Sequence, residues 1–376
     1  MLTPTGSAGL LFREAIPLKP YTTFKIGGPA RFFVPVASPD DFRGALDFSR
    51  RQGAPLFVLG GGSNILVSDR GYDGVVAHPT CRGIEIAAAD SESVTLHVDA
   101  AENWDDLVQF AVAHGWWGIE NLSHIPGQTG AALVQNIGAY GQQVGDVVQS
   151  ARVVEVSTGA LRTLTARECA FGYRRSIFNT SARGEMVIFG ISLRLNKHAR
   201  PQLQYPDLQA YFGEPGTNPP SLQEIRQAII SIRDSKFPFP REERGGNAGS
   251  FFKNLTLTDS ECAELHERIE RNFSARELAR LEEIWKRFGA PNQTKIPAAF
   301  LLDICGLRGH RVGGAQVNEK QPLVLLNQGG ATAHDVLALA QHLRKSVWTR
   351  TGLALAIEPE LVGFAKDEWE FLYNLN

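Results

Sequence analysis

The chain has 376 residues, of which 43% are hydrophobic and 21% are charged. At roughly 150 residues per domain, this length predicts two or three globular domains, each able to bury a core. The 38 basic and 40 acidic residues give a formal net charge of -2 and are interspersed along the chain, which argues against a surface that binds nucleic acid or an anionic membrane.

Cysteine and histidine patterns predict no metal site. The four cysteines, at positions 81, 169, 262 and 305, lie far apart without C-x-x-C spacing, and the nine histidines form no H-E-x-x-H, which fits a reducing compartment. Residues 1–20 lack the pattern of a signal peptide, and no run of about 18 apolar residues is present to span a membrane. We therefore expect a cytoplasmic protein.

The first part of the chain predicts a helix, a strand and a glycine turn. The helix is expected between the N-cap candidate Ser38 and Gly53, because Pro39 suits its first turn. Residues 56–59 read as a short buried strand. The strand leads directly into the turn formed by Gly60, Gly61, Gly62, Ser63 and Asn64.

The middle of the chain predicts a strand, a helix and long loops. Residues 94–98 alternate as in a half-buried strand, and apolar residues between Trp104 and Val112 follow helical spacing. The segment 125–145 is rich in glycine, which predicts loops that allow close backbone approach rather than a regular helix. Such loops commonly hold a ligand.

Two later helices are predicted from capping pairs, Ser221 with Glu224 and Ser274 with Glu277, each of which precedes residues at helical spacing. A third helix is indicated by Thr332, Asp335, Leu337, Ala340 and Leu343. The stretch 200–220, rich in proline, tyrosine and glutamine, reads as a surface insertion. Elements of both kinds recur at short intervals, so the fold class is predicted to be α+β.

Two glycine-rich segments are candidate cofactor sites. The turn at 60–64 offers crowded main-chain N–H groups, which suit a pyrophosphate, although a plain tight turn is an equal alternative. Neither a G-x-G-x-x-G nor a P-loop motif occurs. The segment 125–141 carries small or neutral polar groups, which suit a flavin ring. Its alternative is a structural loop.

Several ordered blocks of sequence resemble one enzyme family. They are TTFKIGG (22–28), GGGSNIL (60–66), IPG (125–127), QNIGAYG (135–141), GYRRSIF (172–178), GNAGSFFKN (246–254) and EPE (358–360). In this order they are similar to the flavin-binding and catalytic motifs of UDP-N-acetylenolpyruvoylglucosamine reductases, in the long form that has a tyrosine loop. The blocks extend over most of the chain, so their joint presence is more specific than any single block.

The resemblance implies a fold and its cofactors. It implies a two-part FAD-binding domain of the vanillyl-alcohol-oxidase type, at 1–80 and 81–235, and a separate α+β substrate-binding domain at 236–360, with 361–376 returning to the first part. FAD receives hydride from NADPH and passes it to the enolpyruvyl group of a UDP-sugar, although the sequence does not decide between NADPH and NADH. The expected FAD-binding residues are Thr23, Gly60, Gly61, Gly62, Ser63, Asn64, Ile125, Pro126, Gly127, Gly130, Asn136, Gly138, Ala139 and Tyr140.

The resemblance also implies three catalytic residues. Arg174 is expected to stabilise the enolate because its planar guanidinium matches a carboxylate, Ser250 to donate the proton to C2, and Glu360 to assist at the enol. Without the resemblance, Arg174 is predicted to form a structural ion pair. Ser250 is then predicted to be an ordinary serine in a turn. No G-x-S-x-G surrounds Ser250, which argues against an acyl-enzyme nucleophile.

Three further residues are expected to bind the sugar nucleotide. Tyr205 resembles the clamping tyrosine of the long form, Lys236 is a candidate point charge for the pyrophosphate, and Asn254 a hydrogen-bonding partner. An exposed loop tyrosine is the alternative for Tyr205. The charged stretch 239–245 departs from the family pattern, which leaves the approach of Lys236 open. The helical segment 273–288 is a second departure from that pattern.

Two rival functions stay open at this point. One is a small-alcohol or sugar oxidase on the same FAD scaffold, which would react with oxygen and have no role for Ser250. The other is a noncatalytic sugar-nucleotide-binding protein, which would have no reason to keep Arg174, Ser250 and Glu360 together. We expect a monomer that binds small molecules.

Overall fold

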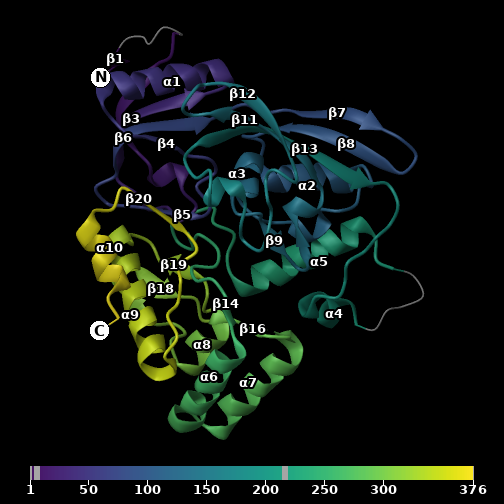
Figure 1. Ribbon diagram of the computed structural model, residues 1–376, viewed down its shortest axis with the longest axis vertical. Helices are drawn as coiled ribbons and strands as arrows, with labels where there is room; N and C mark the ends of the chain where they lie inside the picture. The colour runs from purple at the N-terminus through teal and green to yellow at the C-terminus, as the bar shows by residue number, and fades with distance from the viewer. Residues whose placement is uncertain (1, 4–8, 214–218, 376) are drawn as a thin grey trace. The chain divides into compact units, whose positions relative to one another are not determined.

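The protein consists of two compact units (Figure 1). The structure, a computed structural model, describes residues 2–3, 9–213 and 219–375. The first unit comprises Met1–Ile16, Ala30–Gly62 and Tyr72–Ser235, and the second comprises Pro17–Pro29, Ser63–Gly71 and Lys236–Asn376. The expected three-part division at residues 80 and 235 stays a prediction.

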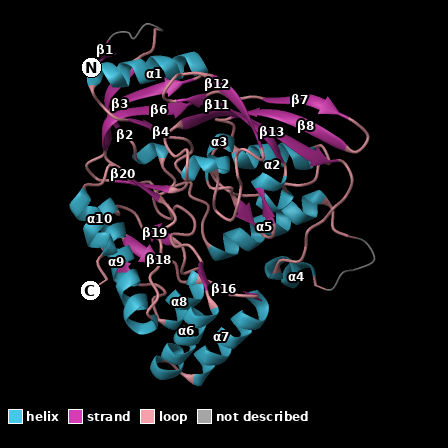
Figure 2. Cartoon of the chain, viewed as in Figure 1, coloured by secondary structure: helices cyan, strands magenta, loops and turns pink. Residues whose placement is uncertain are grey.

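A five-stranded sheet in the first unit has the strand order β1-β2-β3-β6-β4 (Figure 2). Its parallel pairs are β3 with β6 and β4 with β6. Phe42 and Leu46 from helix α1 (Pro39–Gln52) share a buried cluster with Val75 and Ala77 of β6. The strands are β1 (Leu2–Thr3), β2 (Phe12–Pro17), β3 (Pro29–Val36), β4 (Leu56–Val58) and β6 (Tyr72–Pro79).

A second five-stranded sheet of the first unit is antiparallel, with the order β12-β11-β13-β8-β7. Its buried cluster includes Leu107 from helix α2 (Trp104–Ala113) and Ile225 and Ile229 from helix α5 (Leu222–Lys236). The strands are β7 (Ile84–Ala89), β8 (Ser93–Asp99), β11 (Val148–Glu155), β12 (Leu161–Thr165) and β13 (Met186–Asn196), and β9 (Gly138–Ala139) and β10 (Gln142–Gln143) form a separate hairpin.

The helices of the first unit are α1 (Pro39–Gln52), α2 (Trp104–Ala113), α3 (Thr129–Val134), α4 (Pro206–Phe212) and α5 (Leu222–Lys236). The expectation that 125–145 holds no regular helix is wrong for α3. The glycines of this segment lie mostly outside the helix, and Gly130 occupies its first turn, while Ala132 and Leu133 are buried. The burial of this apolar face compensates for the low helix propensity of one glycine.

The second unit surrounds one large buried cluster. Strand β20 (Glu360–Val362) pairs in parallel with β5 (Ile65–Val67), so the C-terminal segment returns to an early part of the chain. The helices are α6 (Asp259–Asn272), α7 (Ala275–Phe288), α8 (Ala298–Ile304), α9 (Ala333–Thr351) and α10 (Lys366–Tyr373). The other strands are β14 (Leu255–Leu257), β15 (Gly289–Ala290), β16 (Gln293–Ile296), β17 (Arg311–Val312), β18 (Ala315–Val317) and β19 (Leu325–Asn327).

Capping patterns predicted most of the long helices correctly. The Ser38 hydroxyl accepts from Asp41 N at the start of α1, and Thr332 with Asp335 forms a capping box on α9. Helix α6 was missed, although Thr258 and Glu261 form the same device. Residues 214–218 of the expected insertion lie outside the described residues. Within the described part of the chain, no helix has the length and apolarity needed to cross a membrane.

Candidate active site

Two glycine turns lie against each other in the first unit. A Cβ atom on Gly61 would lie 2.6 Å from the Cα of Gly127 and 2.9 Å from the nitrogen of Gln128, so only glycine fits. Gly62 and Gly127 both have positive φ angles, which glycine adopts at low cost. Main-chain amides without covering side chains form the type of surface that holds a dinucleotide pyrophosphate. The expected residues of these turns therefore fit FAD.

The segments that contain Gly130 and Asn136 belong to the same unit as these two glycine turns. Gly130 N donates to the carbonyl of Ala100 at 2.9 Å, and a Cβ on Gly130 would meet the Cβ of Ala100 at 2.7 Å. Asn136 is buried with φ 47°, and its Nδ2 donates to the Gly172 carbonyl at 2.9 Å. The amide of Asn136 therefore ties the expected flavin segment to the segment that carries Arg174.

Arg174 lies beside the hairpin that carries Gly138 and Ala139. Its Nη2 donates to the carbonyl oxygen of Gly138 at 2.8 Å, and its own backbone has φ 51°. Asn179 Nδ2 donates to the Arg174 carbonyl at 3.0 Å, which holds this conformation. The guanidinium carbon of Arg174 also lies 5.6 Å from the ring centroid of Tyr173.

Tyr140 and Tyr205 contact each other in the first unit. Their rings are T-shaped with centroids 5.2 Å apart, and Tyr205 is exposed at the N-cap of α4. Burial raises the pKa of Tyr140 to about 12, against the opposing charge of Arg233, so the phenol is neutral at physiological pH. The expected substrate tyrosine thus lies against an expected flavin residue.

The remaining expected cofactor residues belong to the second unit. Thr23 Oγ1 donates to the Asn247 carbonyl at 2.7 Å, which ties the TTFKIGG segment to the block that carries Ser250. Asn64 Nδ2 donates to the Glu358 carbonyl at 3.3 Å, and Glu360 N donates to the Asn64 carbonyl at 2.9 Å. Ser63, next to Asn64, is partly buried.

Ser250 and Glu360 lie on connected backbone segments of the second unit. Ser250 forms an isolated bridge with Val324, and the carbonyl of the next residue, Phe251, accepts from Glu358 N at 2.9 Å. Ser250 is partly buried and follows Gly249, whose φ is 69°, whereas Glu360 is exposed. The structure therefore brings two of the three expected catalytic residues into one unit, while Arg174 belongs to the other.

Lys236, the last residue of α5, is also the first residue of the segment 236–376 of the second unit, which includes Asn254. Asn254 Oδ1 accepts from Ala298 N at 3.1 Å and so caps the start of α8. The Lys236 carbonyl accepts from Asn318 Nδ2 at 2.9 Å. Each residue has a structural contact of its own, in addition to the expected role in substrate binding.

Strained backbone concentrates in the expected site segments. Among the described residues, eight non-glycine residues have positive φ, and they include Lys25, Asn136, Tyr140 and Arg174 from the family-like blocks. Left-handed conformations of such residues cost about 1–2 kcal/mol each and persist only where surrounding contacts hold them. Strain of this kind is typical of ligand sites.

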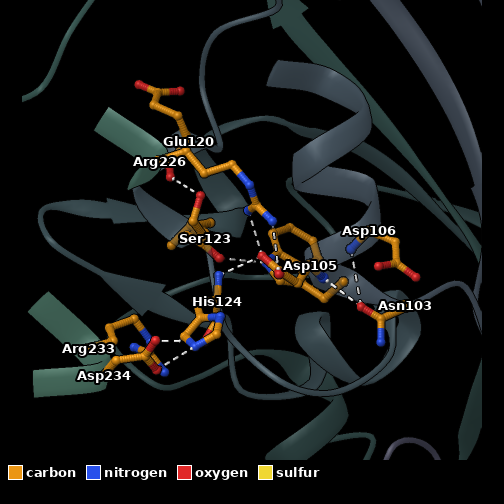
Figure 3. Close-up of polar contacts among 11 residues, drawn as sticks. Asn103, Asp105, Asp106, Glu120, Ser123, His124, Arg226, Arg233 and Asp234 are labelled. Atoms are coloured by element: carbon orange, nitrogen blue, oxygen red, sulfur yellow. Dashed lines mark hydrogen bonds and ion pairs between the residues drawn. The ribbon is translucent and has the colours of Figure 1, made fainter. Parts of the chain in front are cut away.

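Sequence reasoning missed two polar residues that support these segments. Asn121 is fully buried, and its Nδ2 donates to the carbonyls of Tyr140 and Gln202, both at 2.8 Å. His124 contacts Asp105, Arg233 and Asp234 (Figure 3). No periodicity or motif in the sequence singles these residues out; the only sequence signal is that 121–124 directly precede Ile125.

Comparisons with known proteins identify the family of this chain. Residues 240–362 match the family described as UDP-N-acetylenolpyruvoylglucosamine reductase, C-terminal domain, and residues 30–165 match FAD binding domain. The chain is 38% identical over 350 residues to the UDP-N-acetylenolpyruvoylglucosamine reductase of Pseudomonas putida, across 93% of this chain and 98% of that protein. The chain belongs to the UDP-N-acetylenolpyruvoylglucosamine reductase family.

Further similarities support this membership. The UDP-N-acetylenolpyruvoylglucosamine reductase of Chromobacterium violaceum is 37% identical over 351 residues, which cover 93% of this chain and 98% of that protein. The crystal structure of the reductase from Thermus caldophilus matches with a TM-score of 0.61 at 23% identity, covering 96% of this chain and all of that one, and shows a shared fold. The expected fold class and the expected FAD cofactor are confirmed, and the protein is a flavin-dependent oxidoreductase.

Proposed function

We propose that this enzyme uses NADPH to reduce UDP-N-acetylglucosamine enolpyruvate to UDP-N-acetylmuramate in the cytoplasmic synthesis of peptidoglycan precursors. Its relatives in Pseudomonas putida and Chromobacterium violaceum are named for an enolpyruvoylglucosamine reductase activity. When bound, FAD would supply the hydride chemistry that connects NADPH with C3 of the enolpyruvyl group. We also propose that the enzyme acts as a monomer.

The observation that carries this proposal is the hydrogen bond from Arg174 to the Gly138 carbonyl, at 2.8 Å. It holds a permanent positive charge against one of the segments that we assign to the flavin. Hydride arriving at C3 makes the substrate carboxylate enolate-like, and a guanidinium stabilises such charge with two parallel donors. Arg174 is therefore assigned to the enolate.

The FAD is proposed to be held by both glycine turns and the hairpin after α3. The contact of Gly61 with Gly127 supports this assignment for 60–62 and 125–127. The assigned residues are Thr23, Gly60, Gly61, Gly62, Ser63, Asn64, Ile125, Pro126, Gly127, Gly130, Asn136, Gly138, Ala139 and Tyr140. They offer main-chain donors and neutral side chains, which hold a flavin without adding a competing acid.

Ser250 is assigned as the proton donor to C2, and Glu360 assists. A serine hydroxyl is a weak acid, so this role requires polarising neighbours. Support comes from the backbone ladder in which Phe251, next to Ser250, accepts from Glu358 N, while Glu360 N donates to the carbonyl of Asn64. Two buried rings, Phe251 and Phe252, exclude water beside Ser250.

The sugar nucleotide is proposed to contact Tyr205, Lys236 and Asn254. Tyr205 is exposed and lies against Tyr140, an arrangement that suits a ring that stacks on a sugar or base. Lys236 is assigned to the pyrophosphate as a point charge. Asn254 is assigned to a hydrogen bond with the same ligand.

The proposal is tested with an anaerobic flavin spectrum. The purified protein is loaded with FAD, reduced with NADPH and mixed with UDP-N-acetylglucosamine enolpyruvate, for the wild type and for Ser250→Ala. We expect the substrate to reoxidise the wild-type flavin and the variant to be slowed about 10²–10⁴-fold at the proton-transfer step. Ser235→Ala, an exposed serine on α5, is the matched control and should react like wild type.

Each rival function has its own outcome in this experiment. Reoxidation by oxygen but not by the sugar nucleotide would favour an oxidase. Binding of the sugar nucleotide without flavin reduction would favour a noncatalytic binding protein. Light scattering of the loaded enzyme checks the monomer, and a mass near twice 41.2 kDa would overturn it.

A further inference from the structure

His124 is held in a left-handed conformation from three sides (Figure 3). Its φ is 61°, and it is only 7% exposed. Its backbone N–H donates to Asp105 Oδ1 at 2.6 Å, and its carbonyl accepts from Arg233 Nε at 2.9 Å. Its ring Nε2 lies 2.9 Å from Asp234 Oδ1. The amide, the carbonyl and the ring of one residue are therefore all fixed by side chains.

The carboxylate that holds the amide of His124 is itself fixed. Arg226 donates to both oxygens of Asp105, at 2.6 and 3.0 Å, and the two side chains are only 13% and 18% exposed. Burial alone would raise the pKa of Asp105, but the Arg226 and His124 hydrogen bonds outweigh it, so the pKa lies below its ordinary value. Asp105 is charged at neutral pH and accepts strongly.

The contacts of His124 position the residues that follow it, up to Gly127. A left-handed histidine costs about 1–2 kcal/mol unless its surroundings hold it. On its C-terminal side, Gly127 accepts from Trp104 N at 3.0 Å, one residue before Asp105 in α2. The segment from His124 to Gly127 is thus tied at both ends to the first turn of α2, and Asp234 ties the ring of His124 to α5.

Arg233 extends the same network to a second flavin segment. Its Nε donates to the His124 carbonyl, and its positive charge opposes the rise that burial causes in the pKa of Tyr140. One arginine of α5 therefore acts on both the residue before Ile125 and Tyr140, in the turn of the β9–β10 hairpin. Displacement of α5 would move both segments together.

We propose that His124 is a positioning residue, and that its ring contact with Asp234 aligns the 125–127 segment for FAD. This inference rests on the proposed function, in which residues 125–127 bind the cofactor. His124 acts through the backbone that it orients and does not take part in proton transfer. The pair of His124 and Asp234 consequently determines how tightly FAD is held and how well it is oriented.

The test removes the ring contact without touching the buried carboxylate. Asp234 is 53% exposed, so Asp234→Ala should fold. We expect its dissociation constant for FAD to rise about tenfold, as for one lost hydrogen bond to a charged group. We also expect an altered visible circular dichroism band of bound flavin, and a lower kcat with little change in the KM for the sugar nucleotide. Asp234→Asn keeps an acceptor oxygen and should restore most of the affinity.

A second pair supplies the matched control. His198 and Glu92 form an exposed histidine–carboxylate pair in the same unit, at 3.2 Å, and Glu92→Ala should bind FAD like wild type. If Asp234→Ala matches wild type in affinity, dichroism and kcat while wild type binds FAD and turns over, the positioning role is wrong and the proposed function stands. If wild type itself neither binds FAD nor reduces the sugar nucleotide, the proposed function fails instead.

Discussion

The Nη2 atom of Arg174 lies 2.8 Å from the carbonyl oxygen of Gly138, to which it donates a hydrogen bond. This contact joins segments 36 residues apart in sequence. A Cβ on Gly138 would lie 3.2 Å from Nη1 of the same arginine, so the approach is close. The contact fixes one N–H group of the guanidinium against the hairpin. The positive charge of Arg174 is therefore part of the flavin-binding region that we propose.

Arg174→Lys tests whether the planar fork is needed. A lysine keeps the charge, but its single ammonium cannot hold the Gly138 carbonyl and match a carboxylate with two parallel donors. We expect kcat to fall about 10²–10³-fold while FAD content stays unchanged. Steady-state kinetics and the flavin absorbance of the purified protein check this. Arg175→Ala, at the exposed neighbouring arginine, should retain activity, and full activity of Arg174→Lys would exclude the assigned role.

Gly61→Ala tests the contact between the two glycine turns. The new Cβ would lie 2.6 Å from the Cα of Gly127, and that backbone must shift to admit it. We expect a loss of stability of about 1–3 kcal/mol and an FAD-free protein after purification. Thermal melting and cofactor extraction measure both. At Gly83 a Cβ would meet only the Asp99 carboxylate at 3.1 Å, so Gly83→Ala should keep FAD, and cofactor retention by Gly61→Ala would contradict the assignment.

Asn121→Ala tests the bridge between the tyrosine segments. The variant removes the donor shared by the Tyr140 and Gln202 carbonyls. We expect a loss of about 1–3 kcal/mol in the free energy of unfolding and a KM for the sugar nucleotide that rises more than kcat falls, because Gln202 leads to Tyr205. Asn272→Ala removes one exposed bond to the Arg350 carbonyl and serves as the control. An unchanged KM would argue against coupling of this bridge to substrate binding.

Asp105→Asn tests the pH dependence of the buried ion pair with Arg226. The pKa of Asp105 is lower in the folded state than its ordinary value of 3.8, so its ionised form stabilises the fold at neutral pH. This stability is present above about pH 3.8 and is lost as the pH falls through the folded-state pKa. We expect the variant to lose roughly 3–5 kcal/mol at pH 7, with the difference shrinking in acid. Urea unfolding across pH measures it, with exposed Asp106→Asn as the control.

Thiol labelling tests the cysteines. Burial raises the pKa of Cys169 and of Cys305 to about 11, so at pH 8 roughly a thousandth of each is thiolate. Cys262 is also buried and Cys81 is partly exposed. We expect slow reaction of the native protein with a thiol reagent, Cys81 first, and rapid reaction of all four cysteines in denaturant. Rapid labelling of Cys169 in the native protein would contradict the burial.

The local elements and the family could be predicted from the amino-acid sequence alone. Ser38 and Thr332 cap α1 and α9, and Ser274 caps α7, because N-cap chemistry depends on residues within one turn. The glycines at 60–62 and the blocks around Arg174 and Ser250 identified a reductase and its cofactor, since each motif lies within a few consecutive residues. Local sequence signals of this kind can be recognised without knowledge of distant contacts.

The tertiary structure decided which distant residues support the site. Asn121 bonds to Gln202, and His124 donates to Asp105 and accepts from Arg233. These hydrogen bonds join residues far apart in the chain, so no periodic pattern in the sequence predicts them. Helix α3 also formed where glycine content predicted loops, because burial of Ala132 and Leu133 outweighed local propensity. Left-handed conformations of His124, Asn136 and Arg174 depend on these long-range contacts, since the residues alone disfavour them.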